Sequence, residues 1–524
     1  MPDTTIADLS RLQFALTALY HFLFVPLTLG LSFLLAIMES VYVMTGRDVW
    51  RRMTLFWGSL FGLNFAMGVG TGIVMEFQFG TNWSYYSQYV GDIFGAPLAI
   101  EGLMAFFLEA SFIGLFFFGW NKLSRVQHLM VTWLVALGSN LSALWILIAN
   151  GWMQYPTGAS FNPDTMRMEV TDFAAVLLNP VAQAKFVHTV SAGYVCGAVF
   201  VAAISALYLL RGKHVELAKR SLAVAASFGL AAALSVVVLG DESGYTVGEN
   251  QKMKLAAIEG MWETEPAPAG FNLFAIPDQA NQRSRAEIHI PWVMGLIGTR
   301  SLDTEMPGIK DLVAHAEERI RNGQDAYAAL QALRADRGNA QARSTFEAEW
   351  RDMGHALLLK RYRDDIGNAT DEEIAKAALD TVPNVLPLFW TFRIMVALGL
   401  YFIGFFAVAF WYVTTNQIER KRGFLKLALW SLPLPWVAIE AGWIIAEYGR
   451  QPWIIDGVLP TFFAASGLRL YEVVLSLGGF TALYTALAVV EIWLLRKLIR
   501  KGPTDYIGAQ SPPAASALAT SPTA

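Results

Sequence analysis

The chain has 524 residues, of which 55% are hydrophobic and 16% are charged, and its formal net charge is -4. A soluble protein of this size would have about a quarter of its residues charged. The charge is missing from long apolar runs, which excludes a wholly soluble protein. No basic patch interleaved with aromatic residues indicates nucleic acid as a partner. The single cysteine, Cys196, excludes an intrachain disulfide and an all-cysteine iron–sulfur cluster.

Nine apolar runs are each long enough to cross a bilayer, which takes about 20 residues of helix. We therefore predict an all-α integral membrane protein with about nine transmembrane helices. The N-terminal segment is acidic and lacks the features of a signal peptide, so the first run is expected to stay in the membrane. The runs cover residues 13–43, 54–78, 94–120, 127–150, 184–210, 218–239, 386–414, 424–447 and 470–496.

Basic residues gather in alternate connections between these runs. Cytoplasmic loops of membrane proteins carry an excess of lysine and arginine. The prediction is therefore an N-terminus outside and a C-terminus in the cytoplasm. The basic residues are Arg47, Arg51, Arg52, Lys122, Arg125, Arg211, Lys213, Lys219, Arg220, Arg420, Lys421, Arg422, Lys426, Arg496, Lys497, Arg500 and Lys501.

The same pattern divides the chain into four predicted regions. The middle region is charged and too long for a simple turn, so we expect an extracytoplasmic subdomain with helices near 310–335 and 341–363. A purely structural loop is the alternative. The regions are an N-terminal bundle of six helices (1–239), the extracytoplasmic subdomain (240–385), three C-terminal transmembrane helices (386–500) and a Pro/Ala/Ser-rich disordered tail (501–524).

Four side chains in the apolar runs are candidate ligands of haem iron. Ionisable groups inside a span are costly and are therefore functional candidates. Of seven histidines, only His21 and His188 lie within apolar helices. Met395 and Glu447 are expected at the same outer depth. Imidazole, thioether and carboxylate all fit haem iron, and a His/Met pair makes a low-spin haem of raised potential. A hydrogen-bonded core histidine and simple methionine packing are the alternatives.

Polar residues beside these candidates suggest further roles. Arg393 and Arg450 could bind haem propionates, although an Arg450–Glu447 pair within the protein is the alternative. Glu101 and Glu109 are separated by about 12 Å of helix rise on one side of the third span, as a proton relay requires. Ser142 in the fourth span could extend that relay. Neutral, hydrogen-bonded carboxyl groups are the alternative.

Several blocks of sequence resemble subunit I of the cytochrome bd quinol oxidases. The resemblance runs in order from about residue 7 to 500. The blocks are RLQFALTALYHFLFVPLTLG (11–30), GDESGY (240–245), QKMKLAAIE (251–259), FRIMVALG (392–399) and EAGWIIAEYGRQPW (440–453), the last of which contains Trp443.

This resemblance implies a set of cofactors and their ligands. His188 and Met395 would hold a low-spin haem b that takes electrons from quinol. Glu447 would hold a high-spin haem b. His21 would hold the remaining high-spin haem, either haem d or a further haem b. Trp443, Arg393 and Arg450 would lie in the haem environment.

The resemblance also implies the reaction and its partners. Lys254 and Glu259 match residues linked to quinol binding, and Glu101 and Glu109 match acids of a proton pathway. The expected enzyme is a quinol:oxygen oxidoreductase of the bacterial cytoplasmic membrane. It would oxidise ubiquinol or menaquinol at the outer face, reduce O2 to water with cytoplasmic protons, and need no proton pump. A second membrane subunit and small single-span subunits are the expected partners, and the outer subdomain would be a Q loop of the long branch.

Three other classes of membrane protein are alternatives for the same residues. A haem–copper oxidase needs more intramembrane histidines than His21 and His188. A secondary transporter would use the buried acids as an ion path, but no convincing repeat is present. A haem-bearing redox anchor that oxidises quinol without reducing oxygen would not need extra single-ligand haems at His21 and Glu447.

Overall fold

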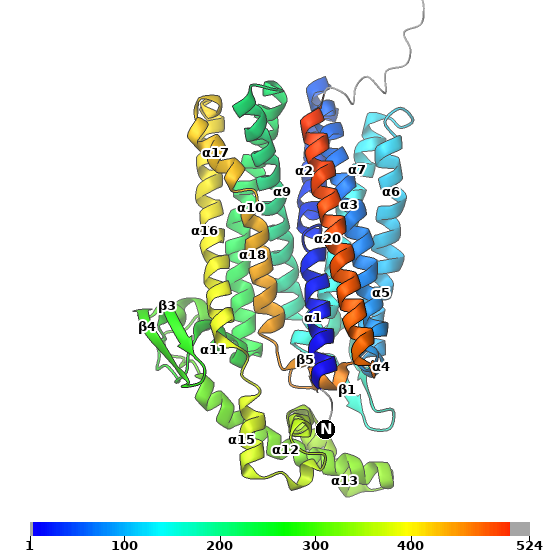
Figure 1. Cartoon of the computed structure of the whole chain (residues 1–524), viewed down its shortest axis with the longest axis vertical. Coiled ribbons are helices and arrows are strands. Elements are labelled where there is room, and N and C mark those ends of the chain that lie inside the picture. The colour runs from blue at the N-terminus through cyan, green and yellow to red at the C-terminus, as the bar shows by residue number, and fades with distance from the viewer. Residues whose placement is uncertain (1–3, 504–524) are drawn as a thin grey trace, which may run out of the picture.

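The computed structural model describes residues 4–503. Within that range nine helical segments are long and apolar enough to cross a membrane, and they stand side by side as one bundle (Figure 1). This confirms the predicted fold class. The segments are α1–α2 (Thr4–His21, Val25–Thr45), α3 (Asp48–Thr81), α5–η1–α6 (Gly91–Ile100, Glu101–Phe106, Phe107–Phe118), α7 (Arg125–Gln154), α8–α9 (Phe173–Leu177, Pro180–Arg211), α10 (Val215–Asn250), α16 (Val385–Thr414), α17–α18–η7 (Arg422–Trp430, Leu434–Trp443, Ile444–Tyr448) and α20 (Leu470–Lys501).

The two ends of the bundle differ in what they carry. Figure 1 shows the N-terminal end of α1 beside the segment that connects α10 to α16, whereas the basic connections lie at the opposite end. We call these the Q-loop end and the basic end. The predicted orientation requires the basic connections to lie together at one end, as they do. That this end faces the cytoplasm stays a prediction. The predicted disordered tail lies almost wholly outside the described residues.

The first membrane segment is broken directly after His21. Pro26 lies in the first turn of α2, and proline has no N–H and clashes with the carbonyl four residues before it. Carbonyl groups released at the break must find other donors, because no water is available in the bilayer core. Trp436 Nε1 donates to the Leu23 carbonyl at 2.8 Å. Asn64 Nδ2 donates at 2.8 Å to the Phe24 carbonyl, which also accepts from Thr28 N, and so ties α3 to the start of α2. The break therefore places His21 at a helix end inside the bundle.

Glycine allows α2 and α9 to approach closely. A Cβ atom at Gly30 would lie 2.4 Å from the Gly193 carbonyl oxygen, and one at Gly197 would lie 2.6 Å from Gly30 Cα. Gly193 and Gly197 are separated by one turn, the small-xxx-small spacing of packed membrane helices. This contact fixes α9, and with it His188, against the first segment.

Two of the membrane segments contain a π-helical turn at a candidate carboxylate. Glu101 begins η1, and Glu447 lies within η7. Single π turns inside α-helices are rare and are found frequently at functional sites. The extra residue in such a turn changes the direction of the side chains that follow it, so both acids lie where the helix register shifts.

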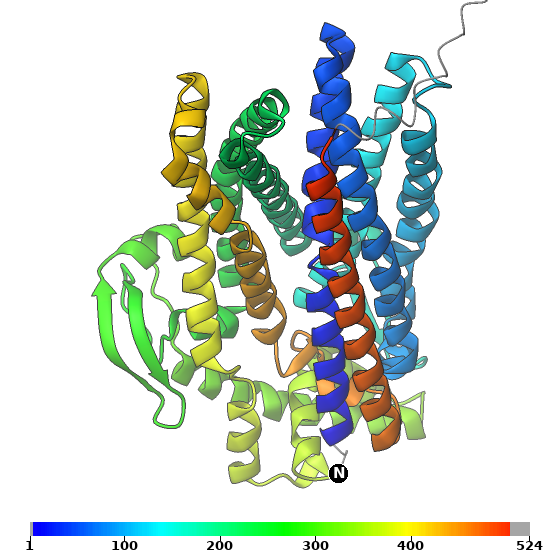
Figure 2. The ribbon, with the colours of Figure 1, turned by 45° about the horizontal axis from the view of Figure 1, so that its top comes forward.

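The Q-loop end contains a subdomain with more structure than the sequence indicated. The helix near 310–335 is present as α12, but the region 341–363 is divided into short helices. The hairpin β3–β4 was not foreseen, and α10 continues to Asn250 rather than ending at 239. Figure 2 shows the hairpin beside α16. The elements here are α11 (Lys252–Glu259), β3 (Phe271–Asp278), β4 (Arg283–Ile290), η2 (Gly295–Thr299), α12 (Ile309–Ala335), α13 (Ala340–Glu349), η3 (Trp350–Asp352), α14 (Met353–Leu357), η4 (Leu358–Arg361), η5 (Ile366–Asn368) and α15 (Asp371–Leu379).

Short elements between the other spans complete the surface of the two ends. The chain after η7 forms the two-stranded β5–β6 sheet, and its side chains share a core with α12 and α7. The subdomain is thereby packed onto the bundle. The remaining elements are α4 (Ser84–Tyr89), β1 (Ala159–Asn162), β2 (Arg167–Val170), η6 (Ile418–Arg420), β5 (Trp453–Ile455), β6 (Leu459–Pro460) and α19 (Thr461–Ala464).

Candidate active site

His21 has one ring nitrogen tied to the protein and the other without a recorded partner in residues 4–503. Its Nδ1 lies 2.9 Å from Thr71 Oγ1. That hydroxyl already donates to the Met67 and Gly68 carbonyls, so it accepts from His21, which then carries its proton on Nδ1. Nε2 keeps its lone pair. A metal-binding histidine is held in this way by a partner on its other nitrogen.

A glycine makes room beside the His21 ring. A Cβ atom at Gly72 would lie 3.1 Å from His21 Cε1, closer than a comfortable contact. Tyr484, from α20, closes the same region by donating its hydroxyl to the Thr71 carbonyl at 2.8 Å. The ring is therefore held against α3, which α20 in turn contacts, and one ring nitrogen is available.

His188 repeats this arrangement on α9. Its Nδ1 lies 3.0 Å from the carbonyl oxygen of Val236. A carbonyl can only accept, so Nδ1 donates and Nε2 keeps its lone pair. A Cβ atom at Gly240 would lie 2.9 Å from His188 Cε1. Both intramembrane histidines thus have a fixed tautomer, a free Nε2 and a glycine beside the ring.

Met395 lies at the level of His188 in the bundle. A Cβ atom at Gly399 would lie 3.6 Å from Val237 Cγ2, and α10 and α16 run in opposite directions (Figure 1). Met395 is one turn from Gly399 toward the Q-loop end, level with the turn of α10 that contacts His188. Its Sδ also faces a glycine, because a Cβ atom at Gly442 would lie 3.2 Å from it.

The Glu447 carboxylate is surrounded by donors from two helices and from the turn that follows η7. Asn150 and Gln154 of α7 donate to Oε1 at 3.0 and 3.2 Å. Lys185 of α9 lies 3.5 Å from Oε1, and Arg450 donates to Oε2 at 2.7 Å. Charge-assisted bonds of this kind hold the carboxylate ionised and in one orientation.

Trp443 connects this carboxylate region to the His21 region. Its ring meets Phe22 edge to face at a centroid separation of 4.6 Å. The Lys185 ammonium lies 5.4 Å from the centre of the same ring. Phe22 follows His21, and Lys185 is one turn before His188. The four candidate ligands are therefore neighbours through a few intervening side chains.

The two arginines differ in how they are used. The Nε and NH1 atoms of Arg450 are buried and have no hydrogen-bond partner among the described residues. Arg393 instead donates from every nitrogen to protein oxygens, including the Asn272 and Ile258 carbonyls and Glu259 Oε2. Arg450 thus has free N–H donors for an anionic group. The N–H donors of Arg393 are instead used by Glu259 and by backbone carbonyls, including one of the hairpin, so none is left for the haem propionate that the sequence suggested.

Lys254 and Glu259 lie on different sides of α11. Five residues along a helix turn it by about 140°, and no contact brings the two side chains together in the described structure. Lys254 is 4% exposed and donates to Gln154, to Gln251 at 2.7 Å and to the Ala446 carbonyl at 3.1 Å. Burial lowers the pKa of Lys254. Its ammonium therefore belongs to the Glu447 region.

Glu259 forms the other polar site at the Q-loop end. It is 2% exposed, and its carboxylate lies 3.0 Å from Arg393 NH2. Burial raises the pKa of Glu259 to about 7, although the Arg393 charge opposes this effect. A carboxyl group with a pKa near neutrality can both accept and release protons under physiological conditions.

The acids of the third membrane segment lie against α7 as the sequence suggested. Ser142 Oγ donates to Glu101 Oε1 at 2.7 Å. Glu109 is 6% exposed, and a Cβ atom at Gly138 would lie 2.7 Å from its Cγ. Ser139 lies beside it. Each acid is thus paired with a hydroxyl of α7.

The geometry fits haem better than a bare metal ion. Residues 4–503 contain no group of three or more His, Cys, Asp or Glu side chains that could hold a metal by themselves. Haem iron needs only one or two protein ligands, because the macrocycle supplies the rest. The free Nε2 atoms, the glycines beside the ligands and the unpaired nitrogens of Arg450 all suit a flat, anionic cofactor.

Sequence reasoning missed several members of this region. Lys185, Asn150 and Gln154 surround Glu447 and were not singled out. Lys185 could have been found, since it is an ionisable residue at the start of an apolar run. The two amides carry no such signal, because their role depends on contacts across nearly 300 positions of sequence.

The fold and this set of candidate ligands are typical of an integral-membrane redox protein. Comparison with known proteins gives its family. The family model "Cytochrome bd terminal oxidase subunit I" matches residues 9–503. The chain is 54% identical over 499 residues to cytochrome bd-II ubiquinol oxidase subunit 1 of Escherichia coli, covering 95% of this chain and 97% of that one. It is 36% identical to cytochrome bd ubiquinol oxidase subunit 1 of Bacillus subtilis, covering 94% and 93%.

A solved structure has the same fold. The bd oxidase of Geobacillus thermodenitrificans matches with a TM-score of 0.76 at 23% identity, covering 96% of this chain and all of that one. The chain belongs to the cytochrome bd terminal oxidase subunit I family. It is a multi-pass protein of the bacterial cytoplasmic membrane and a respiratory oxidoreductase. The predicted family, enzyme class and location are confirmed.

Proposed function

We propose that this chain carries three haems and oxidises quinol at the Q-loop end. His188 and Met395 would hold a low-spin haem b, Glu447 a high-spin haem b, and His21 a further high-spin haem that is either haem d or haem b. The observation that carries the proposal is the matched pair of intramembrane histidines, each with Nδ1 engaged and Nε2 free. When bound, these haems would pass electrons from quinol to dioxygen, which is reduced to water.

The first residues of this chain to act would be those that bind quinol and accept its protons. Glu259 would accept a proton from the quinol hydroxyl, and Arg393 would keep that carboxylate in place. Lys254 would act on the opposite side of α11, where its ammonium adjoins the Glu447 region. Ubiquinol is the proposed substrate, since the more similar relatives are named ubiquinol oxidases; menaquinol is the other quinol considered.

The proton supply would come from the opposite end of the bundle. The basic end faces the cytoplasm in the proposed orientation. Glu101 and Glu109, each beside a serine of α7, would conduct protons from that end toward the His21 region. Release of quinol protons outside and uptake inside would charge the membrane without a pump.

A second membrane subunit is proposed as the partner, and small single-span subunits remain part of the same proposal. The face formed by η1 and α6 exposes large apolar side chains. Leu103, Phe107 and Phe118 are 73%, 58% and 77% exposed. Lipid or a partner helix would cover such a face.

Glu259 gives the proposed quinol oxidation an expected pH dependence. Only the carboxylate form can accept a proton, and the pKa of Glu259 is raised to about 7. We therefore expect kcat/KM for quinol to fall by about tenfold per pH unit below that value. Glu259→Gln should lower kcat/KM and remove this dependence. Oxygen uptake at varied quinol concentration and pH measures both.

The matched control is the exposed carboxylate of Glu263, which pairs with Lys310. Glu263→Gln is expected to keep the wild-type pH profile. A Glu259→Gln protein with the same pH profile as wild type would remove Glu259 from proton acceptance.

The proposed function as a whole is tested by spectra and turnover. The chain, purified with its partner subunit, should show a low-spin b signal in the reduced-minus-oxidised spectrum and a carbon-monoxide-reactive high-spin site. A far-red band would identify haem d at His21. Quinol-driven oxygen uptake should accompany these signals. A colourless preparation, or one that binds haem but takes up no oxygen, would contradict the proposal.

A further inference from the structure

A buried Glu–His pair lies near the basic end, away from all the candidate ligands. Glu39 of α2 and His128 of α7 are 1% and 2% exposed. His128 Nδ1 lies 2.6 Å from Glu39 Oε1, and His128 Nε2 lies 2.9 Å from the Phe116 carbonyl oxygen. Thr132 Oγ1 donates to Glu39 Oε2 at 2.5 Å. Neither the haem ligands nor the quinol site uses these residues.

The hydrogen bonds fix how many protons the pair holds. The Phe116 carbonyl can only accept, so His128 Nε2 carries a proton. A contact of 2.6 Å between His128 Nδ1 and Glu39 Oε1 needs a second proton between them. That proton belongs either to an imidazolium or to a carboxylic acid. In both cases the pair shares one transferable proton.

A cavity adjoins this pair and is lined by residues of the basic end, among them Arg51 and Arg125. It has a volume of about 200 Å³, and Glu39 and His128 form part of its wall. The charged or titratable groups that face the pair there are Arg51 from α3, Arg125 from α7 and Tyr42 from α2. The two arginines would stabilise the pair in the interval when its shared proton has left, because the pair is then negative.

From this pair a row of hydroxyl groups follows one face of α7. His128, Thr132, Ser139 and Ser142 are spaced by four, seven and three residues, which keeps them on one side of a helix. Ser139 lies beside Glu109, and Ser142 bonds Glu101. The one long step, from Thr132 to Ser139, covers about 10.5 Å of rise. It passes Val135 and would need transient water.

We infer that Glu39 and His128 form the entry of the proton pathway on the basic side, feeding Glu109 and then Glu101 along α7. The inference rests on the proposed function, which supplies the demand for protons. A proton from cavity water joins the pair as the earlier one leaves. The leaving proton moves to Glu39 Oε2, and the Thr132 hydroxyl, which donates to that oxygen at rest, turns so that its oxygen accepts this proton while its own proton passes to water on the Ser139 side. Thr132 keeps the proton that it received, and its hydroxyl turns back toward Oε2. The pair thus returns to its starting state.

The test uses the oxidase with its partner subunit in proteoliposomes. Glu39→Gln removes the transferable proton but keeps the shape, and Thr132→Val removes only the hydroxyl. Both are expected to slow oxygen turnover by about tenfold or more, with haem spectra unchanged. Formate supplied on the basic side should restore part of the rate in Glu39→Gln. A D2O-sensitive carboxyl band in the redox-difference infrared spectrum should be lost in that variant.

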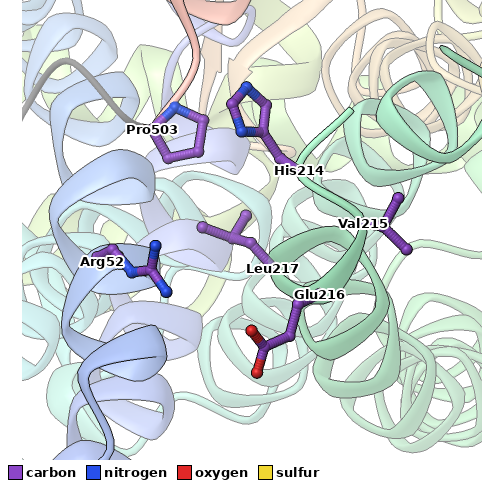
Figure 3. Close-up of a pocket in the computed structure, with 6 residues that line it drawn as sticks. All are labelled: Arg52, His214, Val215, Glu216, Leu217 and Pro503. Atoms are coloured by element: carbon purple, nitrogen blue, oxygen red, sulfur yellow. The ribbon is translucent and has the colours of Figure 1, made fainter. Parts of the chain in front are cut away.

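A second pocket at the same end supplies the matched control. It is lined by Arg52, His214, Val215, Glu216, Leu217 and Pro503 (Figure 3). Figure 3 shows the carboxylate of Glu216 at this pocket, and the exposed Glu216 pairs with Arg220. Glu216→Gln should leave turnover, formate response and infrared bands as in wild type.

Glu109→Gln separates failure of this inference from failure of the proposed function. Slow turnover in Glu109→Gln with wild-type rates in Glu39→Gln and Thr132→Val would overturn the Glu39–His128 entry and leave the deeper pathway in place. Wild-type rates in all three would overturn both. If Glu39→Gln does not assemble, Thr132→Val decides: a normal rate makes the pair a structural link between α2 and α7 and overturns the inference.

Discussion

Replacing Met395 by leucine is expected to abolish the absorbance of the low-spin haem and, with it, quinol-driven oxygen uptake. The two side chains have nearly the same volume, so the exchange should cost less than about 1.5 kcal/mol of folding free energy. What is lost is the thioether that faces Gly442 at the level of His188. A haem left with a single axial ligand changes spin state and potential.

The reduced-minus-oxidised spectrum of the purified variant checks this expectation, and the high-spin signals should survive in it. Met153→Leu is the control, because Met153 is 7% exposed and packs in the hydrophobic cluster shared by α7, α12 and the β5–β6 sheet, whereas Met395 is partly buried in a different cluster. It should keep all signals. Met395→His offers a second check: two axial ligands would remain, and the potential should fall because methionine raises it. An unchanged low-spin band in Met395→Leu would rule out the ligand assignment.

The fold followed from the sequence because a bilayer imposes few solutions. Backbone groups in lipid must be satisfied within the segment, so a long apolar run predicts a helix and its approximate length. The structure differed from the prediction in segments that do not cross the membrane, where this constraint on the backbone does not apply. The β3–β4 hairpin and the short helices after α13 lie in the subdomain at the Q-loop end, where packing against neighbours decides the structure. There the strand pairing of Phe271 with Ile290 could not be read from spacing.

The candidate site followed from sequence only where a residue was conspicuous by itself. His21 and His188 stood out as histidines in apolar helices. The tautomers that make them fit haem depend on Thr71 and on the Val236 carbonyl, which are about 50 positions away in sequence. Arg393 also stood out in the sequence, but its contacts in the folded protein are different from the expected ones. Its charge next to Met395 suggested a haem contact, but the folded hairpin engages its donors.

The same argument explains why the Glu39–His128 pair was missed. In the sequence, His128 lies at the edge of the apolar run 127–150, and Glu39 is a single acid near the end of the run 13–43, so neither residue indicates a role by itself. The two become a proton-sharing unit only when α2 and α7 are packed, across 89 positions of sequence.

Glu447→Gln is expected to remove one high-spin haem and also to destabilise the fold. Lys185 and Arg450 are 14% and 6% exposed, and both lose their anionic partner in this variant. Removing one member of a buried ion pair costs about 3–5 kcal/mol; the lower end applies here because Glu447 itself is 33% exposed. Thermal unfolding and the carbon-monoxide difference spectrum measure the two effects. The exposed Glu249 provides the control, since Glu249→Gln should change neither.

The two effects can be separated with a double variant. In Glu447→Gln with Arg450→Gln, an unpaired buried cation is removed along with the carboxylate, so much of the lost thermal stability should return. The haem signal should not return, because a glutamine amide is a poor ligand for haem iron compared with a carboxylate, and the free Arg450 donors for a propionate are gone as well. Recovery of both stability and haem would make Glu447 a charge partner only. Recovery of stability without haem would show that the Glu447–Arg450 pair is needed to hold the haem, apart from its effect on folding.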